Sequence, residues 1–198
     1  LYICRIKSKD VKASFDYMKS NGAEILGELR TTPHGEPHFF VKDPNGNVFN
    51  VVLEKETFQH TKFPGKTGGV AGAMIGVSNI DEAMKLYADV LGYSKIEYDE
   101  TGTFDCFAEL PAGNKKVRRV LLSHPQLRKG PFAPLLGPTK IELIQSLERD
   151  DCRKIFENRF WGDWGFIHLC FDIQGMEALK NECADNGFPF TVDSGSTF

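Results

Sequence analysis

Hydrophobic and polar positions repeat in the same order at three places along the chain. Each place has a short apolar strand, a polar turn, an amphipathic helix and a closing glycine, and the three segments are 2–22, 73–92 and 167–187. The apolar positions of each helix recur with the period of an α-helix, which predicts one buried face. The closing glycine is well suited to end a helix in the left-handed conformation. The sequence therefore predicts three copies of one unit.

Strand patterns follow the first two helices. The strands of the first copy are predicted at 24–31, 37–42 and 47–54, and those of the second at 94–99, 104–110, 117–123 and 139–146. The turn DPNGN at 43–47 predicts a hairpin, because Pro44 presets φ and Gly46 allows a positive φ. The third copy has its first strand at 166–173 and its helix, and a further strand begins near Phe190. Candidate helix caps are Ser8, Asp10, Ser78 and Asn79.

These patterns predict the organisation of the chain as repeated βαβββ modules. The predicted segments are a metal-free module at 1–55, a linker at 56–69, a second module at 70–148, a connecting helix at 149–164 and the start of a further, truncated module at 165–198. We expect the chain to be part of a longer protein with four modules, paired first with second and third with fourth. In that arrangement the N-terminal module lacks its partner within this chain, or pairs across a dimer by module exchange.

Composition narrows the class of protein without naming a function. The 198 residues include 24 Lys and Arg against 27 Asp and Glu, so no basic excess suggests nucleic-acid binding. No apolar run approaches the ~18–20 residues of a membrane span. The five cysteines are odd in number and form no C-x-x-C pair, which argues against a disulfide framework and a cysteine zinc site. We therefore expect a cytoplasmic protein.

Three stretches resemble one known family. GVSNIDEAMKLYADVLGY at 76–93 resembles the opening strand and helix of the vicinal-oxygen-chelate superfamily, which includes glyoxalases, bleomycin-resistance proteins and extradiol dioxygenases. FFVKDPNGNVFNVVLE at 39–54 is similar to its module-closing hairpin, and GFIHLCFDI at 165–173 to the first strand of a paired module. The resemblance implies an α+β fold, in which repeated βαβββ modules pair into curved half-barrel sheets around a divalent metal ion.

Two positions match the metal ligands that the resemblance implies. Glu142 lies in TKIELIQ and His168 in GFIHLCF. Carboxylate and imidazole groups suit Zn²⁺, Ni²⁺, Mn²⁺ or Fe²⁺, and a glutamate at the metal can also move a proton on carbon. The alternative interpretations are a solvent-facing Glu142 and a hydrogen-bonded core His168. The other ligand positions do not match, since they hold Gly72 or Ala73, Tyr2 or Ile3, and Asn50.

Strand alternation extends this prediction to a substrate pocket. If Glu142 and His168 point into a cavity, the residues that share their faces line it, namely Met74, Lys140, Ile144, Phe166 and Cys170. His34 and His38 are predicted to be solvated, with His38 at a pocket mouth as the weaker alternative. A solvated strand face is favoured over anion binding for Arg118 and Arg119.

The leading functional hypothesis is a glyoxalase-like, metal-dependent lyase or isomerase that acts on a small molecule with adjacent oxygens. Glu142 would then be metal ligand and base, and His168 metal ligand. The alternative is a non-catalytic small-molecule-binding protein of the bleomycin-resistance type, which Gly72 and the metal-free N-terminal module favour. A ring-cleaving dioxygenase would want a histidine near residue 72, so the sequence speaks against it. The expected partners are a small molecule and a second copy of the chain.

Overall fold

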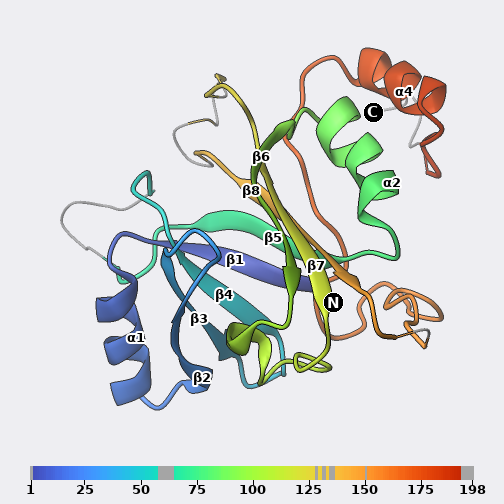
Figure 1. Cartoon of the computed structure of the whole chain (residues 1–198). Coiled ribbons are helices and arrows are strands. Elements are labelled where there is room, and N and C mark those ends of the chain that lie inside the picture. Colours follow the sequence, from blue (N-terminus) through green and yellow to red (C-terminus); the bar gives the residue numbers. More distant parts are fainter. Residues whose placement is uncertain are drawn as a thin grey trace.

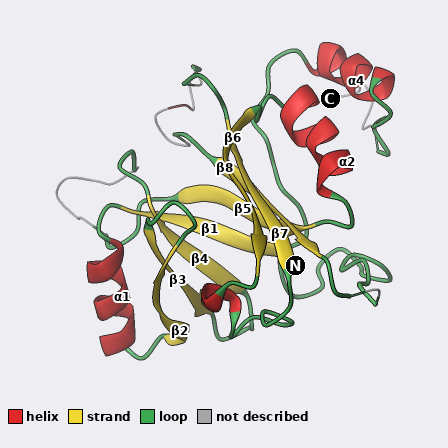
Figure 2. Ribbon diagram, in the orientation of Figure 1, coloured by secondary structure: helices red, strands yellow, loops and turns green. Residues whose placement is uncertain are grey.

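Eight strands form one curled sheet, with the α-helices outside it and a short 3-10 helix on its inner face (Figures 1 and 2). The computed structural model describes residues 2–57, 65–127, 129–130, 133, 137–149 and 151–192. The strand order is β2-β3-β4-β1-β5-β8-β7-β6. The α+β class and the curved half-barrel sheet are as the sequence predicts.

The N-terminal half of the sheet forms where the sequence predicts it. Its elements are β1 (Tyr2–Ser8), α1 (Val11–Ser20), β2 (Glu24–Thr31), β3 (Pro37–Lys42) and β4 (Val48–Leu53). Asp10 caps α1, because its carboxylate accepts the backbone N–H of Ala13 at 2.9 Å. Asp43 closes the predicted hairpin in the same way, accepting from the backbone of Asn45 and Asn47.

The second half repeats this pattern with one departure. Its elements are β5 (Val70–Gly76), α2 (Ile80–Met84), the π-helix η1 (Lys85–Val90), β6 (Lys95–Gly102), the 3-10 helix η2 (Asp105–Phe107), β7 (Val117–Ser123) and β8 (Lys140–Ser146). The prediction of a strand at 104–110 is wrong. That segment instead forms η2, because Phe107 and Leu110 point the same way and pack together onto the inner face of the sheet.

The two halves join along β1 and β5, which pair antiparallel at the centre of the sheet. The expectation that the N-terminal module lacks its partner within this chain is therefore wrong. The long connection 56–69 allows this pairing, and its residues 58–64 lie outside the described part of the chain. Gly68 and Gly69 each hydrogen-bond the backbone of Lys7, so the described end of the connection returns alongside β1.

The segment after β8 differs from its predicted structure. Residues 151–164 form turns rather than a helix, and 166–173 makes no strand pairing. Short helices depend on packing, and here Phe156 and Phe160 are exposed rather than buried. The 166–173 stretch lies on the outer face, where Phe166 contacts the ring of Tyr2 at 5.7 Å. The strands beneath it already pair with a neighbour on each edge, so this stretch finds no free strand edge there. The helix α4 (Met176–Asp185) forms as predicted and contacts η1.

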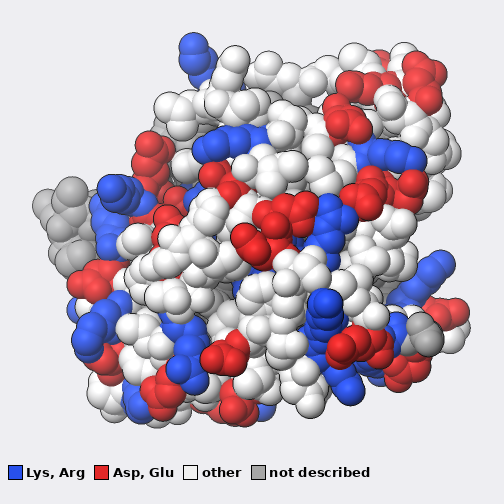
Figure 3. All heavy atoms as spheres, in the orientation of Figure 1, with Lys and Arg blue, Asp and Glu red and all other residues white. Residues whose placement is uncertain are grey.

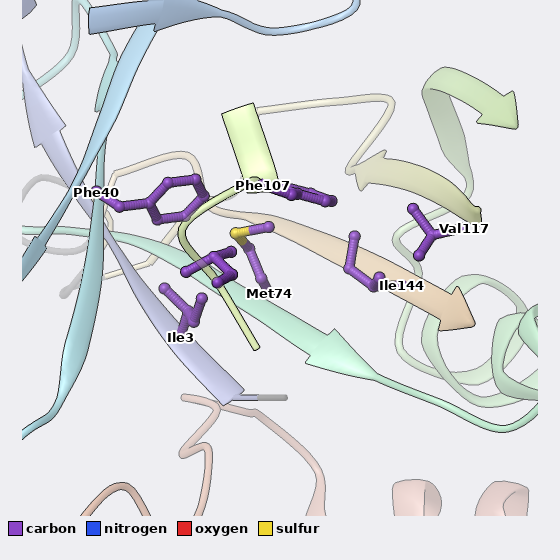
Figure 4. Packing of buried hydrophobic residues seen from close by; sticks show 7 residues of the cluster. Ile3, Phe40, Met74, Phe107, Val117 and Ile144 are labelled. Atoms are coloured by element: carbon purple, nitrogen blue, oxygen red, sulfur yellow. The ribbon is translucent and has the colours of Figure 1, made fainter. Parts of the chain in front are cut away.

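Three buried clusters hold the sheet and helices together. One lies under α1 and one under α2, both on the outer face. The third fills the concave inner face, where η2 covers the sheet, and comprises Ile3, Phe40, Met74, Phe107, Leu110, Val117 and Ile144 (Figure 4). The inner face of the half-barrel is therefore occupied by the chain's own side chains.

The surface shown in Figure 3 intermixes basic and acidic side chains. Within the described residues, no helix has the length and apolar character needed to cross a membrane.

Candidate functional site

Glu142 lies at the centre of the inner face. It is on β8, directly opposite Met74 of β5, and its side chain is 1% exposed. Lys140 and Ile144 share its face, and Met74 and Ile144 belong to the same buried cluster. The register therefore brings Met74, Lys140 and Ile144 around Glu142, as strand alternation predicts. Their role as a substrate pocket stays a prediction.

Two arginines and a tyrosine surround the Glu142 carboxylate. Oε1 accepts hydrogen bonds from the Tyr98 hydroxyl at 2.6 Å and from Arg119 Nε at 2.8 Å. Arg119 Nη2 lies 2.6 Å from the same oxygen. Oε2 faces Arg5 Nη1 at 3.7 Å, a separation too long for a hydrogen bond. These residues come from β1, β6, β7 and β8, so both halves of the sheet build the cluster.

The charges in this cluster fix the ionisation of Glu142. Burial alone would raise the pKa of its carboxyl group. The attraction of Arg119 and Arg5, with the hydrogen bonds from Tyr98 and Arg119, outweighs burial and holds that pKa below its usual range. Burial and the neighbouring carboxylate raise the pKa of Tyr98, so its hydroxyl stays protonated and donates to Glu142. Glu142 is therefore an ionised carboxylate held through Oε1.

Aromatic rings enclose Arg119. Its guanidinium carbon lies 4.4 Å from the ring centre of Phe107, 4.8 Å from that of Phe104 and 5.5 Å from that of Tyr98. Nη1 also contacts the sulfur of Cys106 at 3.4 Å. Cation–π contacts are strongest where water is excluded, and Arg119 is 1% exposed. The solvated strand face predicted for Arg119 is therefore wrong, whereas Arg118 faces outward and pairs with Asp99 and Asp81.

His38 is the second polar residue buried in this region. It is 1% exposed, so its predicted solvation is wrong. The Asn50 side-chain amide donates to the carbonyl of Phe39 at 3.1 Å and lies 2.9 Å from His38 Nδ1. With the amide as donor, Nδ1 is the acceptor and the ring proton is on Nε2. Burial lowers the pKa of His38 to about 4, against opposition from Glu142 and the Thr31 carbonyl. The ring is therefore neutral at pH 7.

Three nitrogen atoms at this site are buried without a hydrogen-bond partner. They are Nε and Nη1 of Arg5 and Nε2 of His38. Arg5 is 3% exposed. Its guanidinium and that of Arg119 face the single carboxylate of Glu142, while His38 is neutral. The cluster of Arg5, Arg119 and Glu142 therefore carries one unbalanced positive charge, which is costly in a buried position.

The remaining predicted site residues lie elsewhere. His168 is exposed and stacks on Trp161, with ring centres 5.2 Å apart. Phe166 packs against Tyr2 and Phe49 on the outer face, and Cys170 is exposed. The structure shows no contact between any of these and Glu142. Lys140 shares the inner face with Glu142 but forms its own ion pair with Glu54 at 2.7 Å.

The surroundings of Glu142 do not fit a divalent metal ion. Both carboxylate oxygens face donors, and a metal would add two positive charges beside the guanidinium groups of Arg5 and Arg119. Among the described residues, no group of three or more His, Cys, Asp or Glu is placed to hold a metal. The metal-ligand roles of Glu142 and His168 therefore gain no support, and they stay predictions.

The backbone explains why position 72 carries no ligand. Gly72 has φ of +125°, and the register of β1 against β5 shifts next to it. A Cβ atom there would lie 1.9 Å from the carbonyl oxygen of Lys140. Since no side chain fits at this point, the absence of histidine is a requirement of how β5 and β8 approach each other.

Sequence reasoning missed Arg5 and Tyr98 altogether. In β1, one face of the strand carries Tyr2, Cys4 and Ile6, and the other carries Ile3, Arg5 and Lys7. The two charged residues give the second face the pattern of a strand face that contacts solvent. In fact both faces are covered, and Arg5 and Lys7 are buried. The signal that could have found Arg5 is the central position of β1 in the sheet, because charged residues on a central strand need buried partners.

Comparison with models of known families identifies the superfamily of the chain. A model of the glyoxalase/bleomycin resistance protein/dioxygenase superfamily matches residues 73–197, and a second model of that description matches residues 4–51. The chain belongs to this superfamily. A comparison with curated proteins found no match.

Several solved structures are similar to the chain at low identity. Glyoxalase I from Zea mays is 17% identical with a TM-score of 0.45, and the match covers 73% of this chain and 42% of that one. A putative dioxygenase from Bacillus subtilis is 16% identical with a TM-score of 0.46, covering 74% and 41%. A methylmalonyl-CoA epimerase from Streptomyces coelicolor is 16% identical with a TM-score of 0.36, covering 73% and 94%. This chain spans less than half the length of the maize enzyme.

Proposed function

We propose that this chain is a metal-independent small-molecule-binding member of the superfamily, the alternative predicted from the sequence. The observation that carries the proposal is the neutralisation of Glu142 by Arg119, Arg5 and Tyr98. Oε1 accepts from Tyr98 and Arg119, and Oε2 faces the Arg5 guanidinium, so a metal cation at this carboxylate would lie beside two buried positive charges. In this proposal the ligand binds at the inner face, where Arg5 offers unpaired donors and the chain's own buried cluster has to make room for it.

Metal loading tests the first half of the proposal. The full chain and its Glu142→Gln variant are incubated separately with Zn²⁺, Ni²⁺, Mn²⁺ and Fe²⁺, desalted, and analysed for metal content. We expect far less than one ion per chain in both proteins. About one ion per chain, lost in Glu142→Gln, would overturn the proposal and favour the metal-dependent lyase or isomerase. The circular dichroism spectrum of the variant establishes that it is folded.

A thermal-shift panel tests the second half. Anionic, neutral and cationic aromatic compounds are titrated into the full chain, and a ligand of the folded state raises the melting temperature increasingly as its concentration exceeds its Kd. We expect at least one compound to give a rise that grows with the logarithm of its concentration. A panel without any such rise contradicts a small-molecule-binding function.

A further inference from the structure

We infer that the buried Arg5 is the anchor for the carboxylate group of a small organic acid. This inference rests on the proposed function and names the class of ligand. Its starting observation is that Arg5 Nε and Nη1 are buried and lack hydrogen-bond partners. Native structures pair nearly all such donors, so two unpaired nitrogens on one buried guanidinium indicate a missing acceptor.

The charge count indicates that this acceptor is an anion. Glu142 neutralises one guanidinium, and it is committed to Arg119 through Nε at 2.8 Å and Nη2 at 2.6 Å. Arg5 is left at 3.7 Å from the other oxygen. One further negative charge beside Arg5 would bring the cluster to neutrality. A buried water would satisfy a donor, but it would leave the positive charge unbalanced.

A carboxylate matches this deficit better than a phosphate. A carboxylate carries one negative charge, whereas a phosphate carries between one and two at pH 7. Arginine binds carboxylates through short, charge-assisted hydrogen bonds. His38 lies in the same electrostatic neighbourhood, since Arg5 and Arg119 both contribute to lowering its pKa.

The surrounding inner face suits an apolar body attached to the carboxylate. Arg5 lies between Ile3 and Lys7 on the inner face of β1, and Ile3 belongs to the cluster that includes Phe40 and Phe107 (Figure 4). Phe107 belongs to η2, which is one turn long and comes from the connection between β6 and β7. A hollow of about 30 Å³ between β2 and η2 reaches Cys106, beside Arg119. Binding of an acid at Arg5 therefore requires the side chains of this cluster to shift, and η2, which carries Phe107, is the element beside the hollow.

Paired acids and amides test the inference. Acetate, benzoate and phenylacetate are titrated into the full chain by isothermal calorimetry at pH 7 and constant ionic strength, together with acetamide, benzamide, phenylacetamide and inorganic phosphate. We expect at least one acid to bind with 1:1 stoichiometry, and its amide to bind at least tenfold more weakly. Phosphate is expected to bind more weakly than that acid.

Variants locate the bound acid. Arg5→Gln is expected to weaken its binding at least tenfold. Arg118→Gln on β7 is the matched control, since Arg118 faces outward and pairs with Asp99 and Asp81, and it should bind as the unaltered chain does. In the absence of ligand, Arg5→Gln should melt at the same or a higher temperature, because it removes an unbalanced buried charge. This measurement separates lost binding from lost folding.

Each outcome decides the inference. No binding by any acid, equal binding of acid and amide, or full binding by a folded Arg5→Gln variant overturns it, as does tighter binding of phosphate. Binding of neutral or cationic compounds alone would overturn the carboxylate site while the small-molecule-binding function stands. A stoichiometric metal ion lost in Glu142→Gln would overturn the proposed function itself.

Discussion

Burial of a neutral histidine makes the stability of this fold depend on pH between about 4 and 6.5. His38 has its pKa lowered from 6.5 to about 4, mainly by burial. In that interval the unfolded chain binds a proton at this residue and the folded chain does not. The free energy of unfolding therefore falls as the pH is lowered, and integration of the linkage relation between pH 7.5 and 4.5 gives a loss of about 2.5 kcal/mol. Above about pH 7.5 this contribution is constant.

The assay compares urea unfolding of three proteins at pH 7.5, 6.5, 5.5 and 4.5, followed by circular dichroism. His38→Gln removes the titrating group but keeps an acceptor for the Asn50 amide. The free energy of the unaltered chain, minus that of His38→Gln, should fall by about 2.5 kcal/mol across this range. His34→Gln is the matched control, the same substitution at an exposed histidine.

The result that refutes this reasoning is a set of parallel pH profiles for the unaltered chain and His38→Gln. Parallel profiles would show that the imidazole titrates equally in the folded and unfolded chains. Burial at 1% exposure would then have no electrostatic consequence at this position. An opposite slope would show that the folded chain binds the proton more tightly, as it would if Glu142 dominated the surroundings of the ring.

Three further predictions concern stability, each measured by urea unfolding at pH 7.5. Glu142→Gln leaves two buried guanidinium groups without a carboxylate and should cost about 3–5 kcal/mol, whereas a loss below about 1 kcal/mol would indicate a solvated cluster. Asp10→Ala removes the cap of α1 and should cost about 1 kcal/mol, and an unchanged midpoint would contradict the cap. Gly72→Ala should prevent folding, because its Cβ would overlap the Lys140 carbonyl. Gly35→Ala, also at positive φ but in open space, should cost only about 1–2 kcal/mol. If Gly72→Ala and Gly35→Ala lowered the free energy of unfolding equally, the predicted clash at position 72 would be wrong.

Features set by neighbouring residues were predictable from the sequence. The turn at 43–47 forms because Asp43 bonds the backbone just after it and Gly46 takes φ of +87°. The helix at 176–185 ends before Gly187, as its pattern indicates. These signals are local, so one chain segment contains them completely. The βαβββ units followed from the repetition of such segments, and their pairing into a curved sheet was implied by the family resemblance.

Features set by distant residues were not predictable in the same way. Arg5 and Glu142 meet only because β1 pairs with β5, and no short motif encodes that pairing. The charged face of β1 is buried by residues of the other half of the chain, so no local signal in β1 indicates its burial. The segment at 104–110 has apolar residues compatible with a strand, and only the available inner face selects a 3-10 turn that buries Phe107.

The antiparallel pairing of β1 and β5 also bears on how copies of the chain assemble. It is the only strand pairing that joins the two halves among the described strands, and residues 56–69 connect them. The same hydrogen bonds would form if β1 of one copy paired with β5 of another, in a swapped dimer. Arg5 of each copy would then face Glu142 of its neighbour. Two variants, each defective in a different half, would thus rebuild one intact cluster when mixed, a form of complementation that a strictly monomeric fold does not permit.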